Sequence, residues 1–446
     1  MSGYEALDPV DLAASRSPVP GSADATLVDF LHYGFSPDYR LASAYAQKVV
    51  GEAARVDSTS SDPAALLCRI IEEQTCDRGQ REVYLPLTAG LDSRGLLGAC
   101  LRIFPASSIR CLTIGLPESQ DVQGAASICR RLGVSHQCVD PSAFVWDLDD
   151  LSETAKSVYR RTGTTPPIDG LKIFDELSKN FDSGVPVLSG YFGGTMSGEV
   201  LPLDAAARTT REGSVNAVVA MNRTYVLGSE GRGGLQRLLH RFLEEHAGLQ
   251  EALPGLSNFD LLHIAWRQRL RIRSVTTAAF STCVMPYEDC RWMKYWLTRP
   301  VSARLGQHEF KKVLKGSFPE VFRDLPGIGI MGDASRALEA FSKRTRRFVP
   351  WRVRQAMKGR GRRRDEMVLD RGDPRTNSSL AKTLAKTTEA FDARGLVPEV
   401  SFHAMYRGLL ERPDWEAWSR LRWVMSAEVH DRAGNFSDRI PGSSRE

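Results

Sequence analysis

A strand, a turn of small residues and a helix follow one another twice near the start of this sequence. Residues 82–87 (EVYLPL) form a short apolar run typical of a buried strand, and the Thr-Ala-Gly turn at 88–90 leads into an apolar helical pattern. The order recurs, with a strand predicted at 109–114 and an amphipathic helix at 121–132. Such alternation restricts the chain to folds built around a parallel sheet.

A third apolar run, at 186–190, also ends on a glycine turn. In an α/β fold of this kind, helices cover both faces of the sheet and ligands bind beyond the carboxyl ends of the strands. We therefore expect the three turns to border one crevice. From about residue 205 onward the pattern is mainly helical, and a final helical block is predicted at 377–430.

Composition excludes several classes of protein. The chain has 446 residues, of which 42% are hydrophobic and 25% charged, and no apolar run approaches the ~20 residues of a membrane span. The first 25 residues show no basic and then apolar signal segment, so we expect a cytoplasmic protein without membrane contact. The eight cysteines include no Cys-x-x-Cys pair, which favours reduced and mostly buried thiols.

The turn at residues 88–93 (TAGLDS) has the features of a phosphate-binding loop. Small residues at 88–90 let the backbone approach an anion closely, and the helix that follows directs its free N–H groups toward the same place. Thr88 and Ser93 add hydroxyl donors, while Asp92 is suited to hold a Mg²⁺ ion that bridges phosphates. The alternative is an ordinary helix N-terminus after a glycine turn.

TAGLDS resembles the SGGLDS pyrophosphate loop of asparagine synthetases and their relatives, which cleave ATP between the α and β phosphates. It differs from the P-loop of kinases, which ends in Gly-Lys-Ser/Thr. Further segments follow in the family's order: 113–136 is similar to its second strand and helix, 189–194 to its SGEGxD turn, and 268–289 to its R-x-R and PFLD segments. The resemblance covers roughly residues 80–325 and implies the five-stranded parallel sheet of the adenine nucleotide alpha hydrolase-like (HUP) fold.

The resemblance implies ATP and Mg²⁺ as ligands. It assigns Tyr191 and Arg323 as catalytic residues, with Tyr191 facing the acyl acceptor and Arg323 supplying positive charge, and it assigns the metal to Asp92. The residues expected to hold ATP are Leu87, Thr88, Ala89, Gly90, Leu91, Asp92, Ser93, Ile114, Ser189 and Gly190.

The sequence departs from the family in three respects. Ser2 stands where the complete synthetases carry a nucleophilic cysteine, and too few residues precede the loop for a glutaminase domain, so we expect ammonia, an amine substrate or a separate amine donor as the nitrogen source. Tyr191 replaces a catalytic Glu, and Gly194 replaces the second Mg²⁺-binding Asp, for which Glu199 is the nearest substitute in sequence. The lysine expected after the PFLD segment is missing, and Arg323 is the substitute.

Residues 343–364 hold eleven Lys or Arg and no acid. A solvated mobile segment is one interpretation, and an acidic partner such as a carrier protein is the other. We do not expect nucleic acid, because only Phe348 and Trp351 interleave with the charges.

Together these features predict an ATP-dependent amide ligase that adenylates a carboxylate for attack by an amine or ammonia, in bacterial natural-product or surface-polymer biosynthesis. The alternatives are a catalytically degenerate nucleotide-binding or scaffold protein, and a thiolating or argininosuccinate-type ligase. The expected organisation is an N-terminal arm and linker remnant (1–60), the ATP-binding domain (61–335), a basic linker or loop (336–372) and a helical C-terminal region (373–446).

Overall fold

The computed structural model describes residues 23–57, 62–76, 79–117, 119–182, 184–224, 226, 233–279, 282–322, 373–412 and 414–436. Arg323 and the basic run at 343–364 lie outside these residues, as does the N-terminal arm before residue 23.

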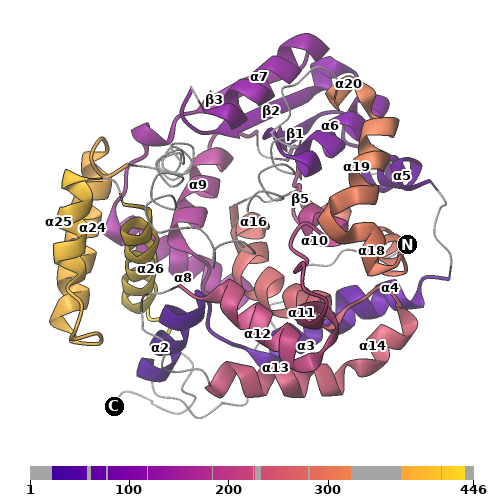
Figure 1. Ribbon diagram of the computed structural model, residues 1–446. Helices are drawn as coiled ribbons and strands as arrows, with labels where there is room; N and C mark the ends of the chain where they lie inside the picture. Colours follow the sequence, from indigo (N-terminus) through magenta and orange to yellow (C-terminus); the bar gives the residue numbers. More distant parts are fainter. Residues whose placement is uncertain are drawn as a thin grey trace, which may run out of the picture.

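A five-stranded parallel sheet lies at the centre of the fold, as the sequence predicts (Figure 1). Its strands are β1 (Val83–Pro86), β2 (Ile109–Ile114), β3 (Ser135–Val139), β4 (Val187–Leu188) and β5 (Cys283–Val284), in the spatial order β3-β2-β1-β4-β5. β1 and β2 pair in register, with Leu85 opposite Cys111. β3 is largely solvent-exposed and β5 has two residues, so neither shows the apolar run that marks a buried strand in the sequence.

Residues alternate between the two faces of the central strands. Val83 and Leu85 of β1 belong to a large apolar core together with residues of α5 (Pro63–Thr75), α6 (Leu91–Ile103) and α7 (Gln120–Leu132). Tyr84 lies in a separate apolar cluster, which it shares with residues of α9 (Ile168–Ser178). Helices therefore pack on both faces, which explains why the central strands are apolar runs rather than alternating ones.

The remaining elements surround this layer. The N-terminal helices are α2 (Ala23–Tyr33), α3 (Tyr39–Tyr45), the π-helix η1 (Ala46–Val50) and α4 (Gly51–Arg55). Between β3 and β5 lie η4 (Pro141–Ala143), α8 (Leu148–Thr162), α10 (Gly193–Ser197), α11 (Ala206–Thr209), α12 (Arg211–Asn222), α13 (Gly233–Glu245), α14 (Ala247–Ala252), α15 (Asn258–Leu262), the π-helix η5 (His263–Arg273) and α16 (Ser274–Ala279). The others are η3 (Ala106–Ser108), η6 (Pro286–Glu288), α17 (Cys290–Leu297), α18 (Val301–Arg304), η7 (Leu305–Gln307), α19 (His308–Ser317), α20 (Pro319–Phe322), α24 (Ser378–Ala393), α25 (Phe402–Glu411) and α26 (Trp415–Arg432).

The C-terminal helices share a core with the first helix that the structure describes. α26 packs against α8, α9 and α2, and α24 and α25 cover its outer side (Figure 1). Phe30 of α2 makes an edge contact with Trp423 of α26, at a centroid distance of 5.9 Å, and a tilted ring contact with Phe436. The boundaries expected near residues 60 and 373 thus divide segments that bury apolar surface against the same core as α8 and α9.

The helical segment from Asn258 to Arg273 consists of two elements. α15 begins at a capping box, in which Ser257 and Asp260 exchange hydrogen bonds, and continues directly into the eleven-residue π-helix η5. π-helical segments are rare and are frequently found at functional sites. None of the described helices combines the length and apolarity needed to cross a lipid bilayer.

Candidate functional site

The strands that follow β1 in the sequence lie on both sides of it in the sheet. From β1 the chain adds β2 and β3 on one side, and β4 and β5 lie on the other side, which makes the carboxyl ends of β1 and β4 a topological switch point. Ligands of open α/β sheets bind at such points. A Cβ atom on Gly190 would lie 3.5 Å from the Ser93 backbone nitrogen and 3.6 Å from the Asp92 Cβ atom. The turn after β4 therefore lies directly on the first turn of α6.

Asp92 fills the space left by two glycines of this turn. A Cβ atom on Gly193 would come within 2.6 Å of the Asp92 Cγ atom, so that position has no room for a side chain. A Cβ atom on Gly194 would lie 3.4 Å from Oδ2 of Asp92 and would overlap Oε2 of Glu199. The carboxylates of Asp92 and Glu199 thus flank Gly194, the position at which the resemblance leads one to expect a second acid.

Burial and the neighbouring Glu199 carboxylate raise the pKa of Asp92 to about 8, against a small opposing effect of the Gly194 N–H group. The Oδ1 atom of Asp92 is buried and accepts no hydrogen bond. A cation placed beside it would offset the repulsion and give this oxygen a partner, so the pair fits a divalent metal such as Mg²⁺, which prefers carboxylate oxygens. Within the described residues no three His, Cys, Asp or Glu side chains come together, so other ligands would be phosphate oxygens and water.

The backbone N–H groups of residues 88–90 already donate hydrogen bonds to protein side chains. The Thr88 N–H donates to Ser93 Oγ (3.1 Å), the Gly90 N–H to Thr88 Oγ1 (3.1 Å), and the Ala89 N–H to Asp121 Oδ1 of α7 (3.0 Å). Three side-chain oxygens therefore occupy the positions in which phosphate oxygens were predicted.

The first turn of α6 is different, because its N-cap, Gly90, provides no side-chain acceptor for the amides of Leu91 to Ser93. Free amides at the start of a thirteen-residue helix favour an anion. A phosphate group bound there would be adjacent to the hydroxyls of Thr88 and Ser93, which lie 3.1 Å apart. The predicted loop residues are thus brought together, with the helix amides rather than the loop amides open to a ligand.

The residues expected to frame the adenosine come from neighbouring strands. Leu87 is fully buried, and its carbonyl accepts a hydrogen bond from Thr113 Oγ1 (2.7 Å). Ile114 is half-buried at the carboxyl end of β2. His136 of β3 contacts Thr113 Oγ1 through Nε2 (2.8 Å), and burial lowers its pKa, which favours a neutral structural histidine.

Tyr191 points into a buried polar network. Its hydroxyl lies 3.4 Å from the hydroxyl of Tyr45, which donates a hydrogen bond to Glu288. Glu288 is paired with Arg273, whose Nε donates to Oε1 at 2.8 Å. Burial, and then the charge of Glu288, raise the pKa of Tyr191, so its phenol is neutral at physiological pH.

The residue after Tyr191 has an unusual backbone. Phe192 has a φ of +75°, in the left-handed region that favours glycine. The SGEGxD turn, which residues 189–194 resemble, carries glycine at this position, the residue to which a positive φ is best suited.

Several residues of the site were not predicted. Glu288 was noted only as part of a motif, and Asp121 only as a spacing match. Tyr45 lies in the segment interpreted as a linker remnant, 243 positions before the carboxylate that it contacts. Nothing in the local pattern distinguishes Tyr45, because the same helical segment also carries Arg40, Ser43 and Lys48.

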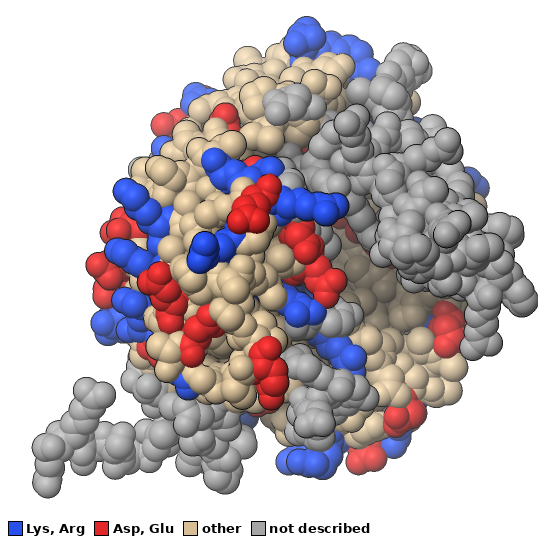
Figure 2. Space-filling model, turned by 60° about the vertical axis from the view of Figure 1, so that its left-hand side comes forward, with Lys and Arg blue, Asp and Glu red and all other residues tan. Residues whose placement is uncertain are grey.

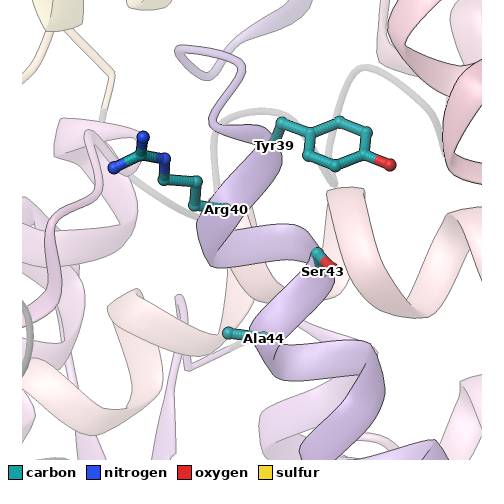
Figure 3. Close-up of a pocket in the computed structure, with 4 residues that line it drawn as sticks. All are labelled: Tyr39, Arg40, Ser43 and Ala44. Atoms are coloured by element: carbon teal, nitrogen blue, oxygen red, sulfur yellow. The ribbon is translucent and has the colours of Figure 1, made fainter. Parts of the chain in front are cut away.

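A pocket of about 450 Å³ lies against α3 and is lined by Tyr39, Arg40, Ser43 and Ala44 (Figure 3). Its polar groups are largely engaged, since Tyr39 donates to Glu245 and Ser43 Oγ lies 3.0 Å from His246 Nε2. It includes none of the predicted site residues, so we do not place the functional site there.

Charges of both signs alternate over the face shown in Figure 2, which gives no extended basic field among the described residues in that view. The predictions for Arg323 and for the basic run fall outside the described residues.

No protein-family model matches this chain, and no curated protein matches it significantly. Functional inference therefore depends on the geometry at the ends of β1 and β4.

The raised pKa of Asp92 predicts a pH-dependent stability. Its folded-state pKa of about 8 exceeds the ordinary 3.8, so the folded protein retains a proton that the unfolded chain releases between these values. The ligand-free protein should therefore lose stability as pH rises from about 4 to 8. Asp92→Asn removes this pH dependence. The unfolding temperature of Asp92→Asn minus that of wild type should therefore increase as pH rises from about 4 to 8.

The control is Asp150→Asn, at an exposed position on α8. Its unfolding temperature should follow that of wild type at every pH. If the Asp92→Asn and wild-type curves are parallel from pH 4 to 8, Asp92 is not a desolvated carboxyl.

Proposed function

We propose that this chain is an ATP-dependent amide ligase of the asparagine synthetase type, which adenylates a carboxylate and transfers the acyl group to an amine or ammonia. The observation that carries the proposal is the contact, at the switch point of the sheet, between the glycine turn at 190–194 and Asp92 at the start of α6. The same two segments carry the resemblance to the pyrophosphate loop and to the SGEGxD turn. The strand order supports assignment to the HUP fold.

The start of α6 supplies the features that pyrophosphate needs. The open amides of Leu91 to Ser93 and the hydroxyls of Thr88 and Ser93 can bind phosphate oxygens, and the helix dipole favours their charge. Asp92 and Glu199 are the residues that would hold Mg²⁺, which when bound neutralises charge on the phosphates. Glu199 thereby replaces the acid that is missing at Gly194.

The buried network behind Tyr191 suggests how a proton could leave the attacking amine. Tyr191 and Tyr45 are within hydrogen-bond distance, and Tyr45 donates to Glu288. If the Tyr191 oxygen accepts a proton from the amine, its own proton can pass to Tyr45, and that of Tyr45 to Glu288. Glu288 is then the final base, and the tyrosines relay the proton without being ionised.

The substrate class is proposed from the resemblance to the family. Relatives without a glutaminase domain resemble tailoring enzymes of bacterial natural-product or surface-polymer pathways, which favours a specialised acid over aspartate. The nitrogen would come from ammonia, an amine substrate or a separate donor protein in the cytoplasm. An acidic carrier protein is the partner that fits the basic run at 343–364.

A second function is favoured by one observation. Gly194 removes a carboxylate from the site, and Glu199 is an exposed residue rather than a buried one. A protein that binds nucleotide without turning it over, as a scaffold or sensor, would tolerate this loss.

ATP–pyrophosphate exchange tests the proposal directly. With Mg²⁺ and a panel of candidate acids, the wild-type protein should incorporate labelled pyrophosphate into ATP, because adenylate formation is reversible. Asp92→Ala should reduce exchange by at least about 100-fold, as expected when a group that stabilises transition-state charge is lost. The matched control is Asp175→Ala, which removes a carboxylate that is paired with Lys179 on the surface of α9. Nucleotide binding without exchange for any acid would instead support the scaffold.

The proton relay makes a separate prediction. Tyr45→Phe removes one hydroxyl and keeps the aromatic packing, so formation of the amide should fall by about 100-fold or more while ATP–pyrophosphate exchange is retained. The two rates are measured on the same preparation. Tyr295→Phe, on α17, is the control and should change neither rate. An equal loss of exchange and amide formation in Tyr45→Phe would show that Tyr45 acts on folding or on adenylation instead.

A further inference from the structure

The π-helix η5 carries an arginine at every second position: Arg267, Arg269, Arg271 and Arg273. Hydrogen bonds of a π-helix join residues five apart, so residues four apart lie on nearly the same side. Arg269 and Arg273 are close to Tyr45 and Tyr191, whereas Arg267 and Arg271 are close to each other on the opposite side. The helix therefore presents two positively charged sides.

Three of the four guanidinium groups have evident protein partners. Arg273 is paired with Glu288. Arg269 Nη2 donates to the Thr162 carbonyl (3.0 Å), and Arg267 Nη1 donates to Asn222 Oδ1 (2.8 Å). These contacts offset the cost of removing the guanidinium groups of Arg267, Arg269 and Arg273 from water.

Arg271 differs from its neighbours. Arg271 donates no hydrogen bond to any residue that the structure describes, and its side chain is half-buried. Its guanidinium lies over the indole ring of Trp423, 4.4 Å from the centroid. Trp423 is held firmly, because its ring packs 2.6 Å from where a Cβ atom of Gly34 would be. Arg271 is thus oriented by an aromatic face, and its N–H groups remain available.

The surroundings of Arg271 are positively charged. Burial lowers its pKa, and the nearby Arg267 and Arg422 lower it further, while Asp169 acts in the opposite direction. Asp169 is itself paired with Arg422 across α9 and α26. The acid that acts on Arg271 is therefore already paired with another arginine, and an added anion beside Arg271 would offset the positive charge around it.

We propose that Arg271, stacked on Trp423, anchors an oxyanion of a small-molecule ligand between η5, α9 and α26. Five N–H donors in a planar fork match the two oxygens of a carboxylate or the face of a phosphate. Identification of this ligand as the acid substrate depends on the proposed function, whereas the anion site does not. A second source of the same chemistry is a phosphate group of the nucleotide.

The test compares wild type with Arg271→Gln in the absence of ATP and Mg²⁺. Thermal unfolding and calorimetric titration are measured with succinate, citrate or inorganic phosphate at millimolar levels, and with sodium chloride at matched ionic strength. Wild type should be stabilised by at least one of the three anions but not by chloride. Arg271→Gln should weaken that anion's affinity by at least about tenfold, the effect of losing charged hydrogen bonds.

The ligand-free proteins provide a second readout. Arg271 forms no hydrogen bond or ion pair with the residues that the structure describes and lies near Arg267 and Arg422, so Arg271→Gln should raise the unfolding temperature above that of wild type. A merely structural arginine would give the opposite sign. Arg420→Gln, which removes the half-buried partner of Glu416 on α26, is the matched control and should retain the anion response.

The anions distinguish the source of the oxyanion. Stronger stabilisation by succinate or citrate indicates a carboxylate ligand, and stronger stabilisation by phosphate indicates a nucleotide phosphate. Asp92→Ala, which disables the proposed nucleotide site, should leave the anion response intact, so the two proposals can fail separately. An absence of anion stabilisation in wild type, or an unchanged response in Arg271→Gln, would overturn the assignment.

Discussion

The close approach of the turn at 190–194 to the start of α6 is the constraint on which the rest of the site depends. A side chain at Gly193 would overlap the Asp92 carboxylate, so this turn can lie against the helix only while it is built from glycine at that position. The approach aligns the ends of β1 and β4 and buries Asp92 beside Glu199. Phe192, with its positive φ, is part of the same tight turn. A positive φ at a non-glycine residue costs stability, and such outliers cluster at functional sites, which is consistent with the proposed site.

A second feature of the structure is that two charged side chains, Asp92 and Arg271, lack hydrogen-bond partners at some of their atoms among the described residues. Asp92 keeps a buried oxygen without a hydrogen bond, and Arg271 has no hydrogen-bonding partner among the described residues. Both arrangements reduce the stability of the ligand-free protein, and both would be relieved by groups of opposite charge: a cation at Asp92 and an oxyanion at Arg271. The side chains of Tyr191, Tyr45 and Glu288, by contrast, are hydrogen-bonded to one another. This pattern is what a site for a metal-bound nucleotide and an acid would require.

The sequence predicts the local part of this account and misses the long-range part. Strands β1 and β2 and helix α7 follow from apolar periodicity, and their observed limits differ from the predicted ones by one residue at most. β3 and β5 lack that signal, since burial of a strand depends on neighbours that the local pattern does not contain. Glu199 is expected to replace the missing acid only because it is near Gly194 in sequence, and the structure places its carboxylate beside Gly194 and Asp92. The Tyr45–Glu288 contact joins distant segments, so no spacing rule could reveal it.

The central claim is that nucleotide binds where the glycine turn meets α6. Hydrogen–deuterium exchange with and without ATP and Mg²⁺ tests it most directly, because the amides at 88–93 and 190–194 are the groups expected to become protected. The account predicts slower exchange in both segments together, and loss of that effect in Asp92→Ala. Protection confined to other parts of the chain, or unchanged exchange in both segments at millimolar ATP, would contradict it.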